Sequence, residues 1–195
     1  MVEAWDVALF RLINGFVGRV AFLDSLARLL VNDYFLTTLM GLSLVVLWFE
    51  GRSSQEREKY QIGVFHTMLS VGLANILLKL CNWRYYRLRP FAVLDQVNML
   101  FYAPSDSSLP SNPATIGFCM ATGIWLWNRS AGAAVGLLAA LFSLARVYSG
   151  VHYPGDILAG VLLGAGSSLL VFGFVLLLKP LFRLVIGVIR LFALA

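Results

Sequence analysis

Long apolar runs constrain the fold of this chain more than any other feature. The clearest are residues 34–49, 61–81, 113–128, 131–148 and 156–178. A helix that crosses a bilayer takes about 20 predominantly apolar residues. The composition agrees, because 59% of the 195 residues are hydrophobic and only 13% are charged, whereas a soluble domain carries about a quarter charged residues. The sequence therefore predicts an all-α integral membrane protein and excludes a large catalytic domain outside the membrane.

The first 30 residues and the C-terminal tail carry a different, amphipathic pattern. Apolar residues recur at helical spacing at Trp5, Leu9, Leu12 and Phe16, and a second stripe follows from Phe22. We expect these two stretches to lie at the membrane interface or to form one imperfect span. The tail from 181 to 194 is expected to lie along the membrane surface. Together with the clear runs, this predicts a bundle of about six transmembrane helices in a single membrane-embedded domain over residues 1–195.

Basic residues outnumber acidic ones, with 15 Lys and Arg against 10 Asp and Glu. Several flank apolar runs, where membrane topology alone places them, so the charge does not indicate a nucleic-acid partner and none is expected. One group falls on one side of the predicted spans: Arg52, Arg57, Lys59, Arg129, Lys179 and Arg183. If the arginines of the other side serve chemistry, this group marks the cytoplasmic side. The 82–112 loop then faces outward from what we expect to be a prokaryotic plasma membrane.

Three stretches place ionisable residues at the ends of spans, where a membrane protein otherwise avoids them. They are residues 79–90, 109–113 and 145–156. Because successive spans alternate in direction, the three stretches lie on the same side of the membrane. This pattern predicts one functional site built from all three.

The third stretch contains a candidate nucleophile. His152 precedes Pro154, a good first-turn residue, so Asp156 falls at the start of the next helix and can reach back to the imidazole. A carboxylate that accepts one ring N–H leaves the other nitrogen with a free lone pair. Arg146, near the end of the preceding span, offers a planar donor fork that suits phosphate.

The other two stretches supply further groups for an anion. Lys79 and Arg89 would bring the positive charges to three, enough to hold a phosphate and the charge that spreads over its oxygens in the transition state. Ser111 and the backbone N–H groups that follow Pro110 add neutral donors at a positive helix end. The residues thus predict a phosphate site.

These features resemble the three signature motifs of the type 2 phosphatidic acid phosphatase superfamily: Arg-Pro after a helix that ends near a Lys, Pro-Ser at the next helix start, and Arg-x5-His-x3-Asp. The resemblance covers about residues 75–166 and implies a six-helix membrane fold. It implies hydrolysis of a membrane lipid phosphate through a phosphohistidine, without a metal or another cofactor. The implied catalytic residues are His152 as nucleophile and Asp156 as its partner; the implied substrate-binding residues are Lys79, Arg89, Ser111, Asn112 and Arg146.

The chain departs from the family pattern at three positions, of which Ala145, in place of the Ser before the third-motif Arg, is a minor loss of one hydroxyl. Asn82 stands where the first motif has its Lys, and Lys79 lies three residues earlier on the same helix face. Pro113 stands where the second motif has a His that serves as general acid. A positioned general acid contributes about 10²- to 10⁴-fold, or roughly 3 to 5.5 kcal/mol. Its loss matters least when the leaving group is a phosphate, whose second pKa is about 6.

The departure at Pro113 therefore favours a lipid diphosphate, such as a polyprenyl diphosphate, over a simple monoester. Asp106 or a Tyr of the loop could instead supply the proton. Two alternatives stay open at this point: a lipid-phosphate binder or carrier that has lost catalysis, and a lipid phosphotransferase. Arg84 and Arg87 are interpreted as head-group contacts outside the core site, and the oligomeric state is left open.

Overall fold

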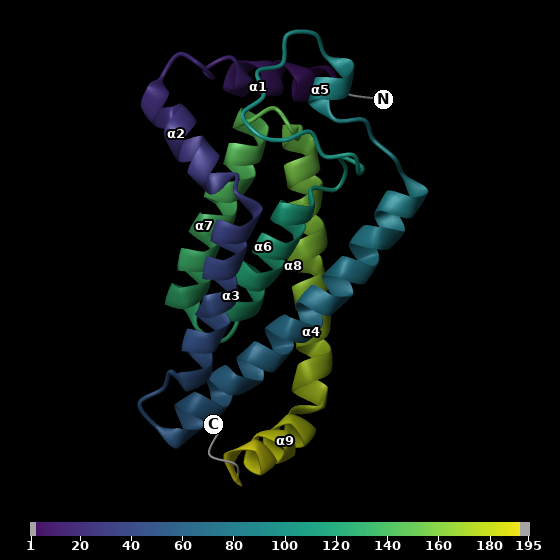
Figure 1. Ribbon diagram of the computed structural model, residues 1–195. Helices are drawn as coiled ribbons and strands as arrows, with labels where there is room; N and C mark the ends of the chain where they lie inside the picture. Colours follow the sequence, from purple (N-terminus) through teal and green to yellow (C-terminus); the bar gives the residue numbers. More distant parts are fainter. Residues whose placement is uncertain (1–2, 192–195) are drawn as a thin grey trace.

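The computed structural model describes residues 3–191, and every regular element in that range is a helix (Figure 1). The helices are α1 (Ala4–Asn14), α2 (Ala21–Leu30), α3 (Asp33–Phe49), α4 (Ser54–Arg84), α5 (Pro90–Val93), α6 (Asn112–Trp125), α7 (Arg129–Tyr148), α8 (Pro154–Leu177) and α9 (Lys179–Leu191). The expected all-α class is confirmed.

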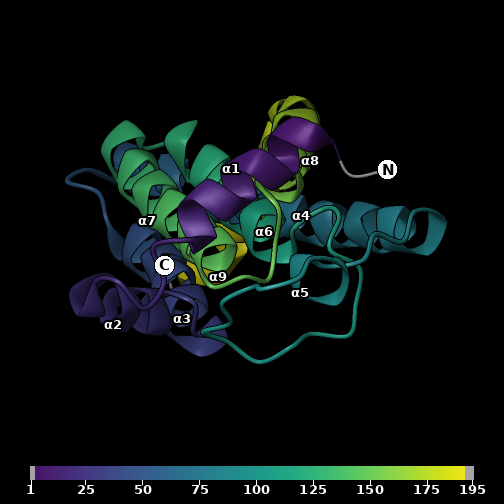
Figure 2. The same ribbon diagram turned by 90° about the horizontal axis from the view of Figure 1, so that it is seen from above.

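The long helices form a bundle with short helices across both ends. Helices α3, α4, α6, α7 and α8 make up the bundle, α1 and α5 lie across one end, and α9 lies across the other (Figures 1 and 2). The central helix is α6, which packs against α4, α7 and α8. Helix α4 crosses the bundle at a slant, so that its C-terminal half extends away from the other helices in both views.

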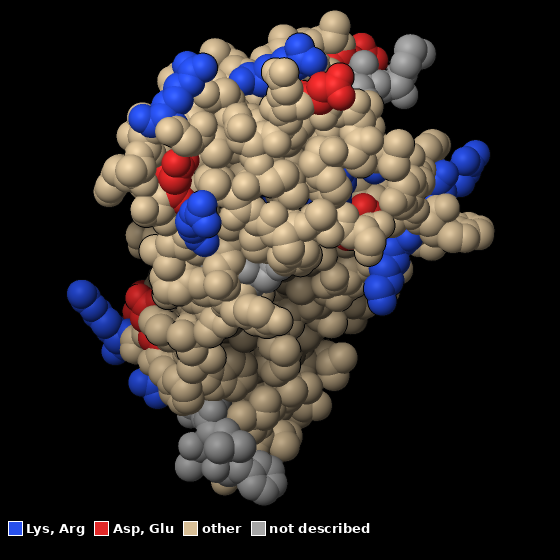
Figure 3. Space-filling view, turned by 45° about the horizontal axis from the view of Figure 1, so that its top comes forward, with Lys and Arg blue, Asp and Glu red and all other residues tan. Residues whose placement is uncertain are grey.

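The helix surfaces match a bilayer environment. Within the described residues, α4, α7 and α8 are long and apolar enough to cross a membrane, and Thr37–Phe49 of α3 forms a shorter apolar helix. Large apolar side chains stand exposed on them, such as Leu162 at 67% and Leu170 at 69%. Charged side chains are sparse and separated by broad uncharged surface in Figure 3. Outward-facing apolar surface of this kind is stable where lipid replaces water.

Helix α4 begins earlier than the sequence pattern predicted. The expected span starts at residue 61, after a charged stretch, but the helix already starts at Ser54 and has 31 residues. Its N-cap is Ser53, whose side chain accepts a hydrogen bond from the Glu56 N–H. Ser at the N-cap followed three residues later by Glu is a strong start signal, and it carries the helix through the charged stretch.

The N-terminal stretches form two separate helices and not one imperfect span. The chain breaks between them at Gly18, whose φ of +80° favours glycine, and the Gly18 N–H donates to Asp24. The inner face of α1 carries Asp6, Phe10 and Asn14, all buried and spaced one turn apart. Helix α1 therefore packs onto the end of the bundle through a buried stripe that contains both polar and apolar side chains.

Small residues bring α6 and α8 into close contact. A Cβ added at Gly160 would lie 2.7 Å from the Ser111 carbonyl oxygen, and one added at Gly164 would overlap the Thr115 carbonyl oxygen. Glycines four residues apart allow two helix backbones to approach in this way. The contact fixes the start of α6 beside the start of α8, where the predicted site residues lie.

Candidate active site

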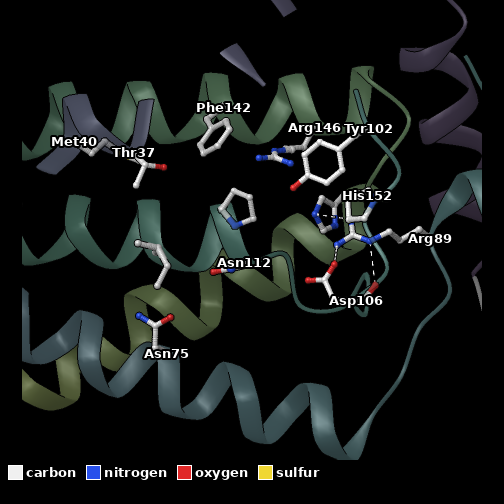
Figure 4. A pocket seen from close by; sticks show the side chains of 13 residues that line it. Thr37, Met40, Asn75, Arg89, Tyr102, Asp106, Asn112, Phe142, Arg146 and His152 are labelled. Atoms are coloured by element: carbon white, nitrogen blue, oxygen red, sulfur yellow. Dashed lines mark hydrogen bonds and ion pairs between the residues drawn. The ribbon is translucent and has the colours of Figure 1, made fainter. Parts of the chain in front are cut away.

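A cavity of about 420 Å³ opens at the end of the bundle where α6 and α8 begin. Figure 4 shows Arg89, Arg146, His152 and Asp106 at one end of it. Its lining also includes Thr37, Met40, Asn75, Tyr102, Pro104, Asn112, Pro113, Ile116 and Phe142. The cavity is polar and cationic toward the loops and apolar toward the middle of the helices.

His152 is buried, and its two ring nitrogens have partners of different kinds. Nδ1 lies 3.0 Å from the Ser108 carbonyl oxygen, and Nε2 lies 3.2 Å from Arg89 Nη1. A carbonyl oxygen can only accept and a guanidinium can only donate, so the proton resides on Nδ1 and Nε2 carries the lone pair. The lone pair therefore belongs to the nitrogen beside the cavity's Arg89, the arrangement that a nucleophile requires.

The surroundings of His152 favour its neutral form. Burial lowers the pKa of the imidazole, the charges of Arg89 and Arg146 lower it further, and Asp156 opposes both by raising it. The balance lies below the ordinary value of 6.5. A neutral imidazole is the form that attacks phosphorus.

Asp156 does not orient His152 by the direct hydrogen bond that the sequence predicted. The distance from His152 Nδ1 to Asp156 Oδ2 is 3.6 Å, and the ring N–H donates to Ser108 instead. Asp156 lies in the first turn of α8, where Oδ2 accepts from the Tyr153 N–H at 2.8 Å and from the Ser108 hydroxyl. The carboxylate caps its own helix and so acts on the imidazole by charge and through Ser108.

Arg89 holds the loops of the site together as well as facing the cavity. Its Nε donates to the Asp106 carbonyl at 3.1 Å, and Nη2 donates to the Asp106 carboxylate at 2.8 Å and to the Ser107 carbonyl at 3.4 Å. Nη1 donates to the Val151 carbonyl at 2.9 Å and contacts His152. All five N–H donors of a guanidinium are thus engaged, and one of these partners is a solvent-exposed carboxylate.

Arg146 reaches the same cavity from the end of α7. Its guanidinium lies 4.6 Å from the centroid of the Phe101 ring and 4.9 Å from that of Phe142. The side chain is 3% exposed. Stacking on aromatic faces holds a guanidinium in place.

The predicted residues at the start of α6 divide into two groups. Asn112 and Pro113 line the cavity, so the position that the resemblance gives to a general acid is occupied by a proline ring. Ser111 is the N-cap and is fully buried, and its hydroxyl has no hydrogen-bond partner in the described part of the chain. An orphaned hydroxyl at a helix N-terminus is a donor available to an anion.

The structure does not place Lys79 in the site, where the sequence predicted it. It is exposed on α4 and does not line the cavity. The physical reason is the slant of α4, which carries its C-terminal half away from the bundle. Asn75, one helical turn earlier, lines the cavity instead.

Three residues near the site were missed or misread from the sequence: Asp6, Arg87 and Ser108. Arg87 was expected to contact lipid head groups, but it lies between the buried carboxylates of Asp6 and Asp156. Asp6 carried a usable signal, because it lies one turn before Phe10 on the buried stripe of α1, where an unpaired carboxylate is costly. Ser108 carried no such signal, because a loop brings its backbone carbonyl to His152 and its hydroxyl to Asp156. Within residues 3–191, no three His, Cys, Asp or Glu side chains gather as a metal site.

Comparison with known proteins agrees with this geometry. A family model of the PAP2 superfamily matches residues 63–179. The bacitracin transport permease protein BcrC of Bacillus licheniformis is 31% identical over 86% of this chain and 79% of its own length. The putative undecaprenyl-diphosphatase YbjG of Escherichia coli (strain K12) is 31% identical over 84% of this chain and 79% of its own. The crystal structure of Aquifex aeolicus LpxE superposes with a TM-score of 0.66 at 26% identity, covering 88% of this chain and 96% of that one.

The fold and the cavity define a helical integral membrane protein with a cationic, histidine-containing cavity at one end of its bundle. The chain belongs to the PAP2 superfamily. The resemblance drawn from the three motifs is confirmed.

Proposed function

We propose that this protein hydrolyses a lipid-linked phosphate and acts best on a lipid diphosphate, such as a polyprenyl diphosphate. The observation that carries the proposal is the state of His152, a buried neutral imidazole whose Nε2 lone pair lies beside a cationic cavity. Membership of the PAP2 superfamily and the similarity to a relative named as a putative undecaprenyl-diphosphatase support it.

In the first step, His152 Nε2 attacks the terminal phosphorus in line. An N–P bond forms, the P–O bond to the leaving group breaks, and the lipid monophosphate departs. The imidazole then carries phosphate on Nε2 and keeps its proton on Nδ1, which donates a hydrogen bond to the Ser108 carbonyl. Arg89, Arg146, Ser111 and Asn112 are the proposed phosphate-binding groups, because fixed donors stabilise the charge on the equatorial oxygens.

In the second step, water attacks the phosphohistidine, the N–P bond breaks, and inorganic phosphate leaves with the His152 imidazole restored. Asp156 is the proposed partner of the histidine in both steps. Its carboxylate, 3.6 Å from Nδ1, offsets the positive charge that the ring gains while it carries the phosphoryl group.

Pro113 supports the preference for a diphosphate. Its ring lines the cavity and has no proton to give to a departing alkoxide. A departing lipid monophosphate needs little protonation, because the second pKa of a phosphate is about 6. The absence of an acid at this position therefore costs a diphosphate substrate less than a monoester.

For the topology, we propose a single membrane-embedded domain of six helices, in which α2 packs against α3 and α7 beside the five helices of the bundle. The end opposite the cavity carries Lys59, Lys179 and Arg183 around one polar depression. By the positive-inside rule this end faces the cytoplasm, so the cavity opens to the outer side of a prokaryotic plasma membrane.

The test uses purified protein with terminally labelled polyprenyl diphosphate and with phosphatidic acid. The proposal expects label to be trapped on the wild type and absent from His152→Ala, with faster phosphate release from the diphosphate. Failure of the wild type to trap label or release phosphate from either lipid would overturn the assignment. Faster release from phosphatidic acid would overturn the substrate preference, and a requirement for an acceptor lipid would identify a transferase.

A further inference from the structure

Arg87 joins the N-terminal helix to the candidate active site. Its Nη2 donates to Asp6 Oδ2 and its Nη1 donates to Asp156 Oδ1, each at 2.6 Å. The two carboxylate side chains are 2% and 0% exposed, and the guanidinium lies 4.4 Å from the centroid of the Tyr153 ring. Burial alone would lower the pKa of Arg87, but the hydrogen bonds and charges of Asp6 and Asp156 outweigh it and raise that pKa. The arginine is therefore a cation held between two buried carboxylates.

Asp6 also holds the first turn of α8 directly. Its Oδ1 accepts from the Gly155 N–H at 2.8 Å, and a Cβ at Gly155 would lie 2.8 Å from Asp6 Oδ2. On the same helix α1, Trp5 and Leu12 are 52% and 63% exposed, as in a helix that lies at a membrane interface. Helix α1 thus extends from a lipid-facing surface to the segment between His152 and Asp156.

The connection continues from Asp156 to the imidazole. The Ser108 hydroxyl donates to Asp156 Oδ2, while the Ser108 carbonyl accepts from His152 Nδ1 at 3.0 Å. Hydrogen bonds therefore run without a break from Asp6 through Arg87, Asp156 and Ser108 to His152. Each residue of this series uses a separate polar atom for the hydrogen bond to the next residue.

We propose that Asp6 and Arg87 are positioning residues of the phosphatase, through which helix α1 fixes Asp156 and the Nδ1–H tautomer of His152. This inference rests on the proposed function. Without the Asp6 charge, Asp156 is the remaining carboxylate bound to Arg87 among the described residues. The guanidinium then turns to bind Asp156 through two parallel N–H groups, the geometry that arginine prefers with a lone carboxylate. That shift draws Asp156 Oδ2 away from Ser108 and loosens the carbonyl that selects the tautomer.

The kinetic test compares Asp6→Asn and Arg87→Lys with the wild type on polyprenyl diphosphate. Arg87→Lys keeps the charge, but a single ammonium does not form the two-sided bridge. We expect kcat to fall about 10- to 100-fold, since misplacement of a reacting group by about 1 Å costs up to 10²-fold. The KM and the inhibition constant of inorganic phosphate should stay within about three-fold, because the cavity arginines are untouched, and Asp6→Glu should recover part of the loss.

Asp24→Asn is the matched control. Asp24 is a carboxylate of the same N-terminal region that binds the Gly18 N–H and the Tyr148 hydroxyl and makes no contact with Arg87. It should keep kcat near the wild-type value. A wild-type kcat in Asp6→Asn overturns the proposal. It is also overturned if Asp24→Asn loses as much kcat as Asp6→Asn when the two variants lose the same Tm.

A spectroscopic test works without substrate. The chain has two histidines, and the other one, His66, accepts from Trp127 at Nδ1 and contacts the Ser168 carbonyl through Nε2. Its tautomer is therefore Nε2–H, opposite to that of His152, and ¹⁵N-histidine NMR should show one histidine of each type. Asp6→Asn should mix the tautomers of His152 and leave His66 unchanged; an unchanged His152 would refute the positioning role. Because this readout needs no turnover, it stands even if the wild type proves inactive and the proposed function fails.

Discussion

Replacing Pro113 by His tests whether the missing general acid sets substrate choice. Pro113 is in the first turn of α6 and lines the cavity that also contains Arg146 and His152. An imidazole at this position would line the cavity in which the proposed function places the phosphate. A positioned general acid is worth about 10²- to 10⁴-fold, and a newly introduced one should deliver the lower end, about 10²-fold, with an alkoxide leaving group. The loss of the proline ring costs only about 0.4–1 kcal/mol of stability.

The measurement is the ratio of kcat/KM for phosphatidic acid to that for polyprenyl diphosphate. Pro113→His should raise this ratio by about 10²-fold, mostly through the monoester, while the diphosphate rate changes by a few-fold. Pro113→Gln removes the ring without supplying an acid and should leave the ratio at its wild-type value. If the Gln variant gains as much as the His variant, or if both substrates gain equally, the leaving-group argument is wrong.

Three further predictions follow from the geometry. Asp156 raises the pKa of His152, and the neutral ring attacks, so Asp156→Asn should move the acid limb of the pH–rate profile to lower pH; a shift to higher pH would contradict this. Asp106→Asn should strengthen inhibition by inorganic phosphate by up to about five-fold, the worth of an exposed ion pair, and weaker inhibition would count against it. Gly164→Ala should lower stability by about 1–3 kcal/mol through overpacking on the α6 backbone, measured as Tm in detergent. Gly166→Ala should leave the stability unchanged, because a Cβ there meets open space. Equal losses of Tm in the two variants would refute the packing argument.

The helices were predictable because their signal is local. Apolar runs and start signals gave α6, α7 and α8 to within a few residues, from predicted limits of 113–128, 131–148 and 156–178. Within the site, His152 and Asp156 were predictable for the same reason, since four residues at a helix start bring two side chains together. What failed was the kind of contact, because the sequence does not reveal that a loop carbonyl of Ser108 competes for the ring N–H.

Residues placed by tertiary geometry were not predictable from local pattern. Lys79 is near the expected end of α4, but the slant of that helix takes it away from the cavity (Figures 1 and 2). Arg87 and Arg89 are two positions apart in one basic loop, yet one binds buried carboxylates and the other faces the cavity. Their partners differ because Arg87 meets Asp6, a residue 81 positions earlier in the chain.

The charges around the site explain why Asp106 matters for substrate binding. Arg87 is balanced by two buried carboxylates, Asp6 and Asp156, which do not line the cavity. With His152 neutral, the charged side chains that do line it are Arg89 and Arg146 against Asp106, a net charge of +1. A net charge of +1 attracts a phosphate dianion less strongly than +2 would. Asp106 is the one of these carboxylates that is exposed, at 59%, and its ion pair with Arg89 is the easiest of the three to open. A phosphate that takes its place on Arg89 meets a net charge of +2 instead of +1. Binding therefore exchanges one anion for another at Arg89, and removing the Asp106 charge should favour phosphate.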